Sequence, residues 1–489
     1  MKIIFLLILC LLGQHIIAQT TFFKTYIRPS HERAFSAAEM PDGGYLLAGE
    51  IRQTGYNGTN EGYLLKISPL GEIVQEKYLN PGNSARLCLI MPYQHESASY
   101  LCIGSSDSLA GDDSFGNKIF YGLDNNLDVV YSKFFRHQFN YLTYPWQYVI
   151  ENDTIMYLQS DNNRINQSNS LSSFVDVAKY RMPFDSLGSY AVPSNSVACD
   201  ILVKSSDSIL DLYVFPSRRR ITLGKNLNYL KTSTYPIEFS SNICTTILDT
   251  AGYLITGEYS NPYTGLGQLG CIKLDNNDIP LDSLIYNPSA DTNYYAGARE
   301  NTVINGNYIY MTGFYNVYAI PFPYNYNPSW VSVTKADLDL NMISTHFYGG
   351  DAQYCPYSII PTSDGGCFVT GYSYDYINNL PNGNYELDIF ALKVDSAGLI
   401  TELPEQPEAK AHDAIIFPNP GREMLNIQSG PQISGAVFTL YDMQGRPVLQ
   451  QNIHTSQLRL QTSNLPAGIY PWQIVFNNKV IESGKWVRE

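Results

Sequence analysis

Few residues in this chain combine the types and spacings that catalysis or metal binding needs. The histidines beyond residue 20 are scattered, without a Cys, Asp or Glu partner at ligand spacing. The chain has no HExxH, GxSxG or GxxxxGK motif. The acidic runs "LDNND" and "ADLDLN" lack the Gly and downstream Glu of an EF-hand loop and suit tight turns instead. We therefore predict no metal, no cofactor and no catalytic motif, while a catalytic site assembled from several segments stays an alternative.

Aromatic side chains are the clearest candidates for recognising a ligand. The segment "NVYAIPFPYNYNPSW" (316–330) carries five rings among three prolines, and Pro limits the entropy lost when a loop becomes ordered. Rings supply large contact areas, so they suit a glycan or a protein ligand, but they also suit packing of the loop against its own neighbours. The candidate ligand-binding residues are Tyr318, Phe322, Tyr324, Tyr326 and Trp330.

The elements around this loop repeat along the chain. "YLLAG", which ends at Gly49, returns as "YLCIG", "IMYLQ", "LDLYV", "YLITG", "IYMTG" and "CFVTG", with steps of 43 to 58 residues. Each copy is followed by a strand, a tight turn and another strand, as in "YLLKISPLGEI". Strand repeats of this length are typical of propeller blades, each a four-stranded sheet. Copies three and four match weakly, so six or eight blades remain alternatives to seven.

Composition favours an all-β fold. Tyr (39) and Gly (36) are abundant, and no stretch has sustained helical periodicity. We predict a seven-bladed β-propeller over residues 20–403. Because the chain opens midway through the repeat, residues 21–27 should supply the outer strand that the seventh copy lacks. The tight "DGG" and "SPLG" turns should share one face, and the long loops should gather on the other, where binding is expected.

The first residues predict export. Residues 1–19 contain a Lys, an apolar run and a small residue near a plausible cleavage point, which predicts a secretory signal peptide, with an uncleaved anchor as the alternative. No later run is long enough to span a bilayer, so we expect no transmembrane segment in the mature chain.

Seven cysteines follow the signal peptide, without a CxxC pair. We expect most of them to be buried thiols. The alternative is a pair of hairpin disulfides, Cys88 with Cys102 and Cys355 with Cys367.

The end of the chain differs from the repeats. Residues 404–413 contain two prolines and alternating charge, which predicts a linker. Residues 414–489 have short alternating strands with closely spaced turns, which predicts a small β-sandwich. Pro471 removes a ladder donor and implies an edge strand or a bulge there. The net charge of −14 resides before this segment, so the acidic propeller should avoid nucleic acid and anionic membranes.

Five motifs in this last segment carry a resemblance. "FPNP", "LNI", "LYDMQGRPV", "LPAGIY" and "GKWV", between residues 417 and 487, together resemble the type A C-terminal sorting domain of type IX secretion cargo from Bacteroidetes. The resemblance implies an Ig-like sandwich, the type IX secretion machinery as partner, and release or attachment at the outer-membrane surface. An accessory sandwich that stays attached is the alternative. The implied motif positions are Pro418, Asn419, Pro420, Tyr441, Asp442, Gly445, Gly468, Tyr470 and Lys485.

Two further resemblances concern the repeats. Residues 21–403 look like propeller repeats of secreted Bacteroidetes proteins, which implies a fold and no chemistry. Asp followed by Ser or Thr and then a small or apolar residue resembles the O-glycosylation motif of exported Bacteroidetes proteins. The implied acceptors are Ser108, Thr154, Ser186, Ser208, Thr250, Ser283 and Ser396.

These patterns predict an exported, cell-surface or secreted binding module for a glycan or a protein. One alternative is an extracellular enzyme acting on polysaccharide or peptide, and another is a structural or adhesive surface protein. An enzyme needs clustered acidic, His or Tyr side chains with perturbed pKa on the loop-rich face, whereas a binding module can rely on aromatic and amide groups.

Overall fold

The structure is a computed structural model of the 489-residue chain. The chain divides into two compact units, Met1–Glu402 and Leu403–Glu489. The described residues are 20–52, 59–80, 84–106, 117–135, 141–151, 154–165, 171–192, 198–204, 209–215, 219–234, 239–248, 252–289, 292–317, 328–376, 386–400, 414–429, 435–442, 446–455, 457–476 and 479–488. The predicted signal peptide (1–19) and the whole predicted linker (404–413) lie outside them.

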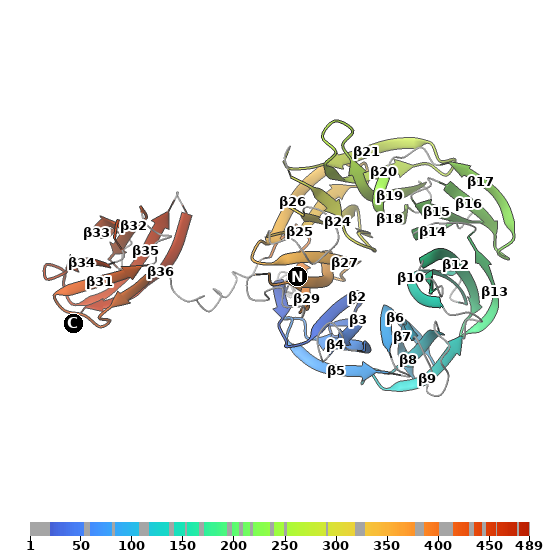
Figure 1. Ribbon diagram of the computed structural model, residues 1–489, viewed down its shortest axis with the longest axis horizontal. Coiled ribbons are helices and arrows are strands. Elements are labelled where there is room, and N and C mark those ends of the chain that lie inside the picture. The colour runs from blue at the N-terminus through green and yellow to red at the C-terminus, as the bar shows by residue number, and fades with distance from the viewer. Residues whose placement is uncertain are drawn as a thin grey trace, which may run out of the picture. The chain divides into compact units, whose positions relative to one another are not determined.

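The described part of the first unit is a ring of seven antiparallel sheets around a central axis (Figure 1). Blade 1 contains β2 (His31–Glu39), β3 (Tyr45–Arg52), β4 (Glu61–Ile67) and β5 (Ile73–Leu79). Blade 2 contains β6 (Ala85–His95), β7 (Ala98–Ser106), β8 (Asn117–Leu123) and β9 (Val129–Phe135). Blade 3 contains β10 (Tyr141–Glu151), β11 (Ile155–Ile165), β12 (Leu171–Arg181) and β13 (Asp185–Ala191).

The other four sheets complete the ring. Blade 4 contains β14 (Ala198–Lys204), β15 (Ile209–Phe215), β16 (Arg219–Gly224) and β17 (Tyr229–Thr234). Blade 5 contains β18 (Phe239–Leu248), β19 (Gly252–Ser260), β20 (Gly267–Leu274) and β21 (Pro280–Tyr286). Blade 6 contains β22 (Tyr294–Ala296), β23 (Thr302–Asn305), β24 (Tyr308–Tyr315), β25 (Trp330–Asp337) and β26 (Met342–Gly349). Blade 7 contains β27 (Gln353–Pro361), β28 (Cys367–Tyr374), β29 (Asp388–Val394) and β1 (Phe22–Tyr26).

Blade 7 joins the two ends of the propeller, as the sequence predicts. β1 pairs with β29 from Phe22 opposite Lys393 to Tyr26 opposite Ile389. Phe22 is buried and contacts the rings of Tyr45 in blade 1 and Phe368 in blade 7. The N-terminal strand therefore covers a sheet edge and also packs the seam between the first and the last blade.

The antiparallel order of the strands determines on which face of the ring each turn lies. In blade 1 the first and third connections are tight turns at Asp42–Gly44 and Ser68–Glu72, where Asp42 and Ser68 accept backbone hydrogen bonds, and the other described connections at these two positions are also short. Because neighbouring strands are antiparallel, these turns share one face of the ring, called here the tight-turn face. The long connections share the opposite face, called here the loop-rich face, and most of them lie outside the described residues.

The second unit is a sandwich of two sheets. One contains β30 (Ala414–Phe417), β31 (Met424–Ser429) and β34 (Gln457–Gln461), and the other contains β32 (Val437–Tyr441), β33 (Pro447–Asn452), β35 (Gly468–Phe476) and β36 (Lys479–Arg488). Phe438, Trp472 and Trp486 pack between them. The expectation of an edge strand at Pro471 is wrong, because β35 pairs on both sides; its pairing with β32 stops at Trp472, so no donor is needed at the proline.

Six cysteines are buried thiols outside any disulfide: Cys88, Cys102, Cys244, Cys271, Cys355 and Cys367. Cys102 pairs with Ile90 rather than Cys88, and Cys355 pairs with Tyr372 rather than Cys367, so neither predicted hairpin disulfide forms. The described residues also hold no cluster of metal-ligating side chains. Among the described residues there is no helix long and apolar enough to cross a membrane.

Candidate functional site

The innermost strands of four blades each carry one bulged residue. Pairing passes over Phe35 in β2, Cys88 in β6, Trp146 in β10 and Tyr357 in β27. A bulge leaves its extra residue out of the ladder and turns its side chain in a new direction.

The repeated Gly of the sequence explains three of these bulges. A Cβ on Gly49 would lie 1.8 Å from the carbonyl oxygen of Arg33, and one on Gly104 would lie 2.1 Å from that of Arg86. Gly371 has the same relation to Cys355. Only Gly lets the bulged inner strand approach so closely. In blade 3 the equivalent residue is Ser160, one place after the Gln159 of the sequence alignment.

The bulged rings meet on the axis of the ring. Phe35 lies with its ring centroid 5.4 Å from that of Trp146 and 5.2 Å from that of Tyr357. Trp146 and Tyr357 are 6.4 Å apart. Because blade 2 separates Phe35 from Trp146 along the ring, these contacts must cross the centre, so three blades together close the channel with aromatic rings.

The three rings form a floor across the channel. Two arginines lie closer to the loop-rich face than this floor, at the same position of blades 1 and 2. Arg33 donates to Oε1 of Glu50 through Nε at 2.8 Å and also through Nη2, and Arg86 places Nε 2.5 Å from Oε2 of the same carboxylate. Glu50 is fully buried. Burial alone would raise the pKa of Glu50, but Arg33 and Arg86 outweigh it and lower the pKa to about 2.

A third arginine reaches the centre from blade 6. The inner edge of that blade is split between β22 and β23, and the connecting residues pair instead with β27: Ala298 N donates to Pro356 O, and Ile359 N donates to Glu300 O. Arg299 thereby crosses to blade 3, where its guanidinium lies 4.3 Å from the ring centroid of Trp146 and 3.3 Å from Asp161.

Two carboxyl groups accompany Arg299. Burial raises the pKa of Asp161, and Arg299 and the amide of Gln159, which donates to Asp161 at 2.7 Å, offset only part of that effect. Burial likewise raises the pKa of Glu300, whose Oε2 accepts a hydrogen bond of 2.8 Å from the Ser358 hydroxyl. Both carboxyls therefore have structural partners on the channel wall.

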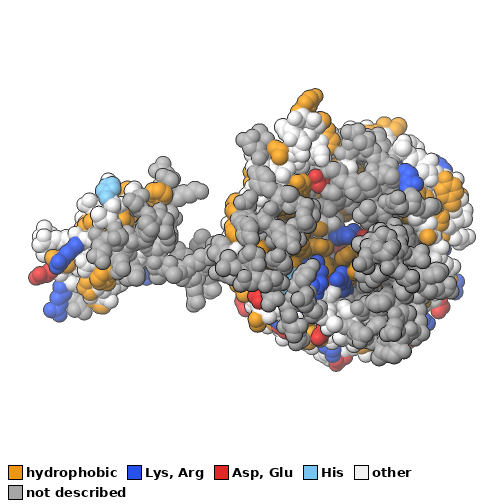
Figure 2. Space-filling model, viewed as in Figure 1, with side chains coloured by type: hydrophobic (Ala, Val, Ile, Leu, Met, Phe, Trp, Pro, Cys, Tyr) orange, Lys and Arg blue, Asp and Glu red, His pale blue; other side chains and the backbone are white. Residues whose placement is uncertain are grey.

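We call Arg33, Phe35, Arg86, Trp146, Arg299 and Tyr357 the central cluster. Its arginines remain open to solvent, with side-chain exposures of 21% for Arg33, 23% for Arg86 and 30% for Arg299. Positively charged and hydrophobic side chains are visible together in the hollow at the middle of the ring (Figure 2). Arg33, Arg86 and Glu50 lie near the strand ends of the loop-rich face, so the cluster opens toward that face.

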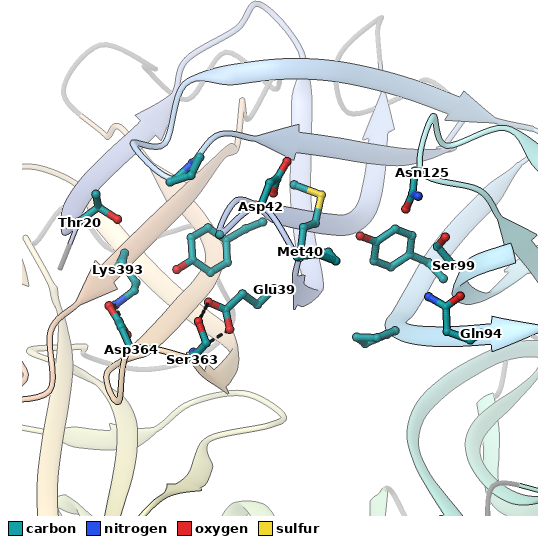
Figure 3. Close-up of a pocket in the computed structure, with 16 residues that line it drawn as sticks. Thr20, Glu39, Met40, Asp42, Gln94, Ser99, Asn125, Ser363, Asp364 and Lys393 are labelled. Atoms are coloured by element: carbon teal, nitrogen blue, oxygen red, sulfur yellow. Dashed lines mark hydrogen bonds and ion pairs between the residues drawn. The ribbon is translucent and has the colours of Figure 1, made fainter. Parts of the chain in front are cut away.

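A separate pocket of about 850 Å³ lies on the tight-turn face, among blades 7, 1 and 2. The charged side chains in its lining already have partners within the protein: Ser363 donates to Glu39 through both N and Oγ at 2.8 Å, Lys393 donates to Asp364 (Figure 3), and Asp42 accepts from Gly44 N. These contacts join blade 1 to blade 7 and stabilise blade 7, which accounts for the charged groups without a ligand.

The aromatic loop predicted to bind lies mostly outside the described residues, including Tyr318, Phe322, Tyr324 and Tyr326. Trp330 begins β25 at the loop-rich face, is half-buried, and contacts Tyr315 at 6.0 Å. Among the predicted O-glycosylation sites, Thr154, Ser186, Ser283 and Ser396 are exposed, whereas Ser108, Ser208 and Thr250 lie outside the described residues.

In the second unit, the predicted motif residues from the two ends of the domain touch. Asn419 donates to Lys485 O at 2.8 Å and accepts from Val487 N at 2.9 Å. The Trp486 indole donates to Pro418 O at 2.8 Å, and Pro420 follows in the same connection between β30 and β31. The "FPNP" turn is thus clamped to the "GKWV" strand.

The other motif residues have local roles. Tyr470 donates to Pro466 O at 2.7 Å, and Tyr441 accepts from Gln473. Asp442 accepts from Arg446 N and Nε at 2.9 and 2.7 Å. Gly468 is exposed at the start of β35, Lys485 is exposed on β36, and Gly445 lies outside the described residues.

Residues 415–488 match the family described as the secretion system C-terminal sorting domain. These residues form a type IX sorting domain. The sorting domain directs the chain to export, so the protein is secreted or held at the outer-membrane surface, and it implies contact with the type IX machinery.

Solved structures resemble the chain at low identity. A protein of unknown function from Bacteroides caccae is 10% identical, with 62% of this chain and 93% of that chain covered and a TM-score of 0.38. The WD40 domain of coronin from Toxoplasma gondii is 8% identical, with 76% and 86% covered and a TM-score of 0.40. PorZ, a surface component of the type IX secretion system of Porphyromonas gingivalis, is 8% identical, with 93% and 81% covered and a TM-score of 0.24. No curated protein matches the sequence.

Sequence reasoning missed the central cluster. Its residues are spread over 325 positions, from Arg33 to Tyr357, and no linear motif joins them. One signal was available: the Gly that ends "YLLAG" and "YLCIG" marks a bulge in the strand before it, and an arginine precedes that bulge by two residues in both copies.

Proposed function

We propose that this exported propeller is a binding module for a glycan or a protein and that the central cluster is its binding site. The observation that carries the proposal is the convergence of three partly exposed arginines, from blades 1, 2 and 6, above aromatic rings at the centre of the loop-rich face. Variable loops around a rigid ring are where recognition usually resides. The loop 316–330 is proposed to form part of the rim.

The proposal is tested by screening the purified mature chain against glycans and surface proteins, beside the variants Trp146→Ala and Arg299→Gln. Both variants should fold, as checked by circular dichroism and thermal melting, and both should lose the interactions that the wild-type chain shows. A wild-type interaction that survives in both folded variants would place the binding site elsewhere and end the proposal.

A second candidate is an extracellular hydrolase, favoured by the raised pKa of Asp161 and Glu300 near the axis. Both carboxyls are, however, held by Gln159, Arg299 or Ser358, which gives each of them a structural role. The variant Glu300→Gln separates the two functions. A hydrolase should lose turnover and keep substrate affinity, whereas the binding module should show no turnover in either form.

A further inference from the structure

The arginines of the central cluster have donors to spare. Contacts among the described residues occupy Nε and Nη2 of Arg33, Nε of Arg86 and Nη1 of Arg299. A guanidinium carries five N–H groups, so each arginine keeps N–H groups that these contacts do not use. Donors from three blades therefore surround one small volume.

Each of these guanidinium groups also lies over an aromatic ring. Arg33 lies over Phe35 at 5.5 Å, Arg86 lies over Tyr144 at 4.9 Å, and Arg299 lies over Trp146 at 4.3 Å. Stacking holds the flat group while leaving its edges available, and a pre-organised arginine loses less entropy when it binds an oxyanion.

The charge at the centre of the ring is opposite in sign to the net charge of the chain. The whole protein has a net charge of −14, whereas at the centre of the ring Arg33 and Arg86 share the carboxylate of Glu50, and Arg299 pairs with Asp161. The hollow is thus a local positive region inside an acidic protein, and such a recess concentrates anions.

From this geometry we propose that the central cluster binds an anionic glycan, one that bears carboxylate or sulfate groups. The inference rests on the proposed binding function and specifies its ligand. The flat arginine fork matches the paired oxygens of a carboxylate or a sulfate. The ring closes the hollow on all sides and the aromatic floor closes it below, so the site suits a projecting group at a chain end.

A sugar fits this site better than an acidic peptide does. The cluster offers rings and guanidinium groups, whose flat faces suit the C–H face of a pyranose, and none of its six residues is aliphatic. Peptide recognition by strand addition instead uses main-chain pairing at a sheet edge, with pockets for alternate side chains.

The test compares matched probes by isothermal titration calorimetry with the mature chain. Tetragalacturonate is paired with its neutral methyl ester, a sulfated galactan oligosaccharide with its unsulfated form, and a short polyglutamate serves as the acidic peptide. We expect one acidic glycan to bind at least tenfold more tightly than its neutral partner. Affinity should fall at least tenfold in Arg86→Gln and in Arg299→Gln, and it should be unchanged in Lys66→Gln, which removes one positive charge at the tight-turn side.

The response to pH adds an independent arm. Because burial raises the pKa of Asp161, protonation of Asp161 frees Arg299 as the pH falls. The sulfated probe, which keeps its charge, should bind more tightly as the pH is lowered, and this gain should vanish in Asp161→Asn. Glu50 keeps its charge until the pH approaches its pKa of about 2.

The outcomes are distinguishable. Equal binding of a charged probe and its neutral partner, lost in Trp146→Ala but kept in both arginine variants, would overturn the anionic class and leave the binding function intact. Binding of polyglutamate as tight as that of the acidic glycans would overturn the glycan class. Binding of every probe unchanged in Trp146→Ala, Arg86→Gln and Arg299→Gln would overturn both the inference and the proposed function.

Discussion

The propeller and the sorting domain use their recognisable sequence motifs differently. In the sorting domain, the motif residues contact one another: Asn419 and Pro418 hold the strand that contains Lys485 and Trp486. In the propeller, the repeated glycines and turn residues act mainly on the backbone. Gly49 and its equivalents leave room for a carbonyl, and the turn residues satisfy N–H groups.

The residues that make the propeller distinctive occupy repeat positions where the blades disagree. Two residues before each bulge stand Arg33 and Arg86 in blades 1 and 2, but Tyr144 and Cys355 in blades 3 and 7. Positions that repeat from blade to blade therefore identify residues of the scaffold, and positions that differ between blades identify residues of the candidate site. The sorting domain occurs as one copy, so its scaffold and site residues cannot be separated in this way.

The largest effect should come from separating the two units. Deleting residues 414–489 removes the sorting domain, so in a type IX secreting host the propeller should remain in the periplasm. Surface proteolysis and cell fractionation measure this, and the thermal transition of the propeller should not move. Delivery of the truncated chain to the surface at the wild-type level would show that the sorting domain is not the address.

Within the propeller, Glu50→Gln should have the largest effect on stability. It leaves two arginine charges without their buried partner and should lower the free energy of unfolding by about 3 kcal/mol. The control is Glu72→Gln in the same blade, since Glu72 is 71% exposed and pairs with Lys24 at the surface, where a pair contributes little.

The pH dependence of this effect has a definite sign. Since the pKa of Glu50 falls from 4.5 to about 2 on folding, the stabilisation by its charge is present above pH 4.5 and is lost as the pH falls toward 2. Chemical denaturation at several pH values should show a constant difference between wild type and Glu50→Gln above that range. A difference that grows in acid would contradict the assigned pairing.

A smaller loss is expected at the glycine that permits the bulge. In Gly49→Ala, the new Cβ meets the carbonyl oxygen of Arg33, which should cost about 1–3 kcal/mol through backbone displacement. Gly468→Ala is the matched control, because its Cβ meets nothing closer than 3.9 Å. If both variants melt at the wild-type temperature, the glycine does not serve the bulge.

The architecture was predictable because the pattern of strand and turn residues repeats in the sequence of each blade. Even the closing strand followed from the incomplete last copy, and β1 with its partner β29 confirms it. Blade 3 aligned one residue out of place because Ser160 stands where five of the other blades have Gly. The central cluster was not predictable, since only ring closure brings Phe35, Trp146, Arg299 and Tyr357 together. In the sequence these residues lie far apart, and no linear motif joins them.

The smallest structural effect should follow from O-glycosylation, which we propose at the exposed residues Thr154, Ser186, Ser283 and Ser396. These positions lie in turns or on outer strands, away from the central cluster, so removing them should lower the mass of the exported protein without changing its melting temperature or its binding. Intact mass spectrometry of secreted wild type decides the matter: a mass equal to that of the bare mature polypeptide would dispose of the modification.

The central claim, that binding occurs in the hollow of the loop-rich face and not in the pocket of the tight-turn face, is tested most directly by blocking each face in turn. Ser84→Cys lies just before Arg86 on the loop-rich face, and Asn125→Cys lines the tight-turn pocket. Maleimide polyethylene glycol should label these new thiols selectively, because burial raises the pKa of native thiols such as Cys88 and Cys271 to about 12. Labelled wild type is the control. The account predicts that label at position 84 abolishes the binding of whichever acidic glycan probe the wild type binds in calorimetry, and that label at position 125 leaves this binding unchanged. The reverse pattern would contradict it.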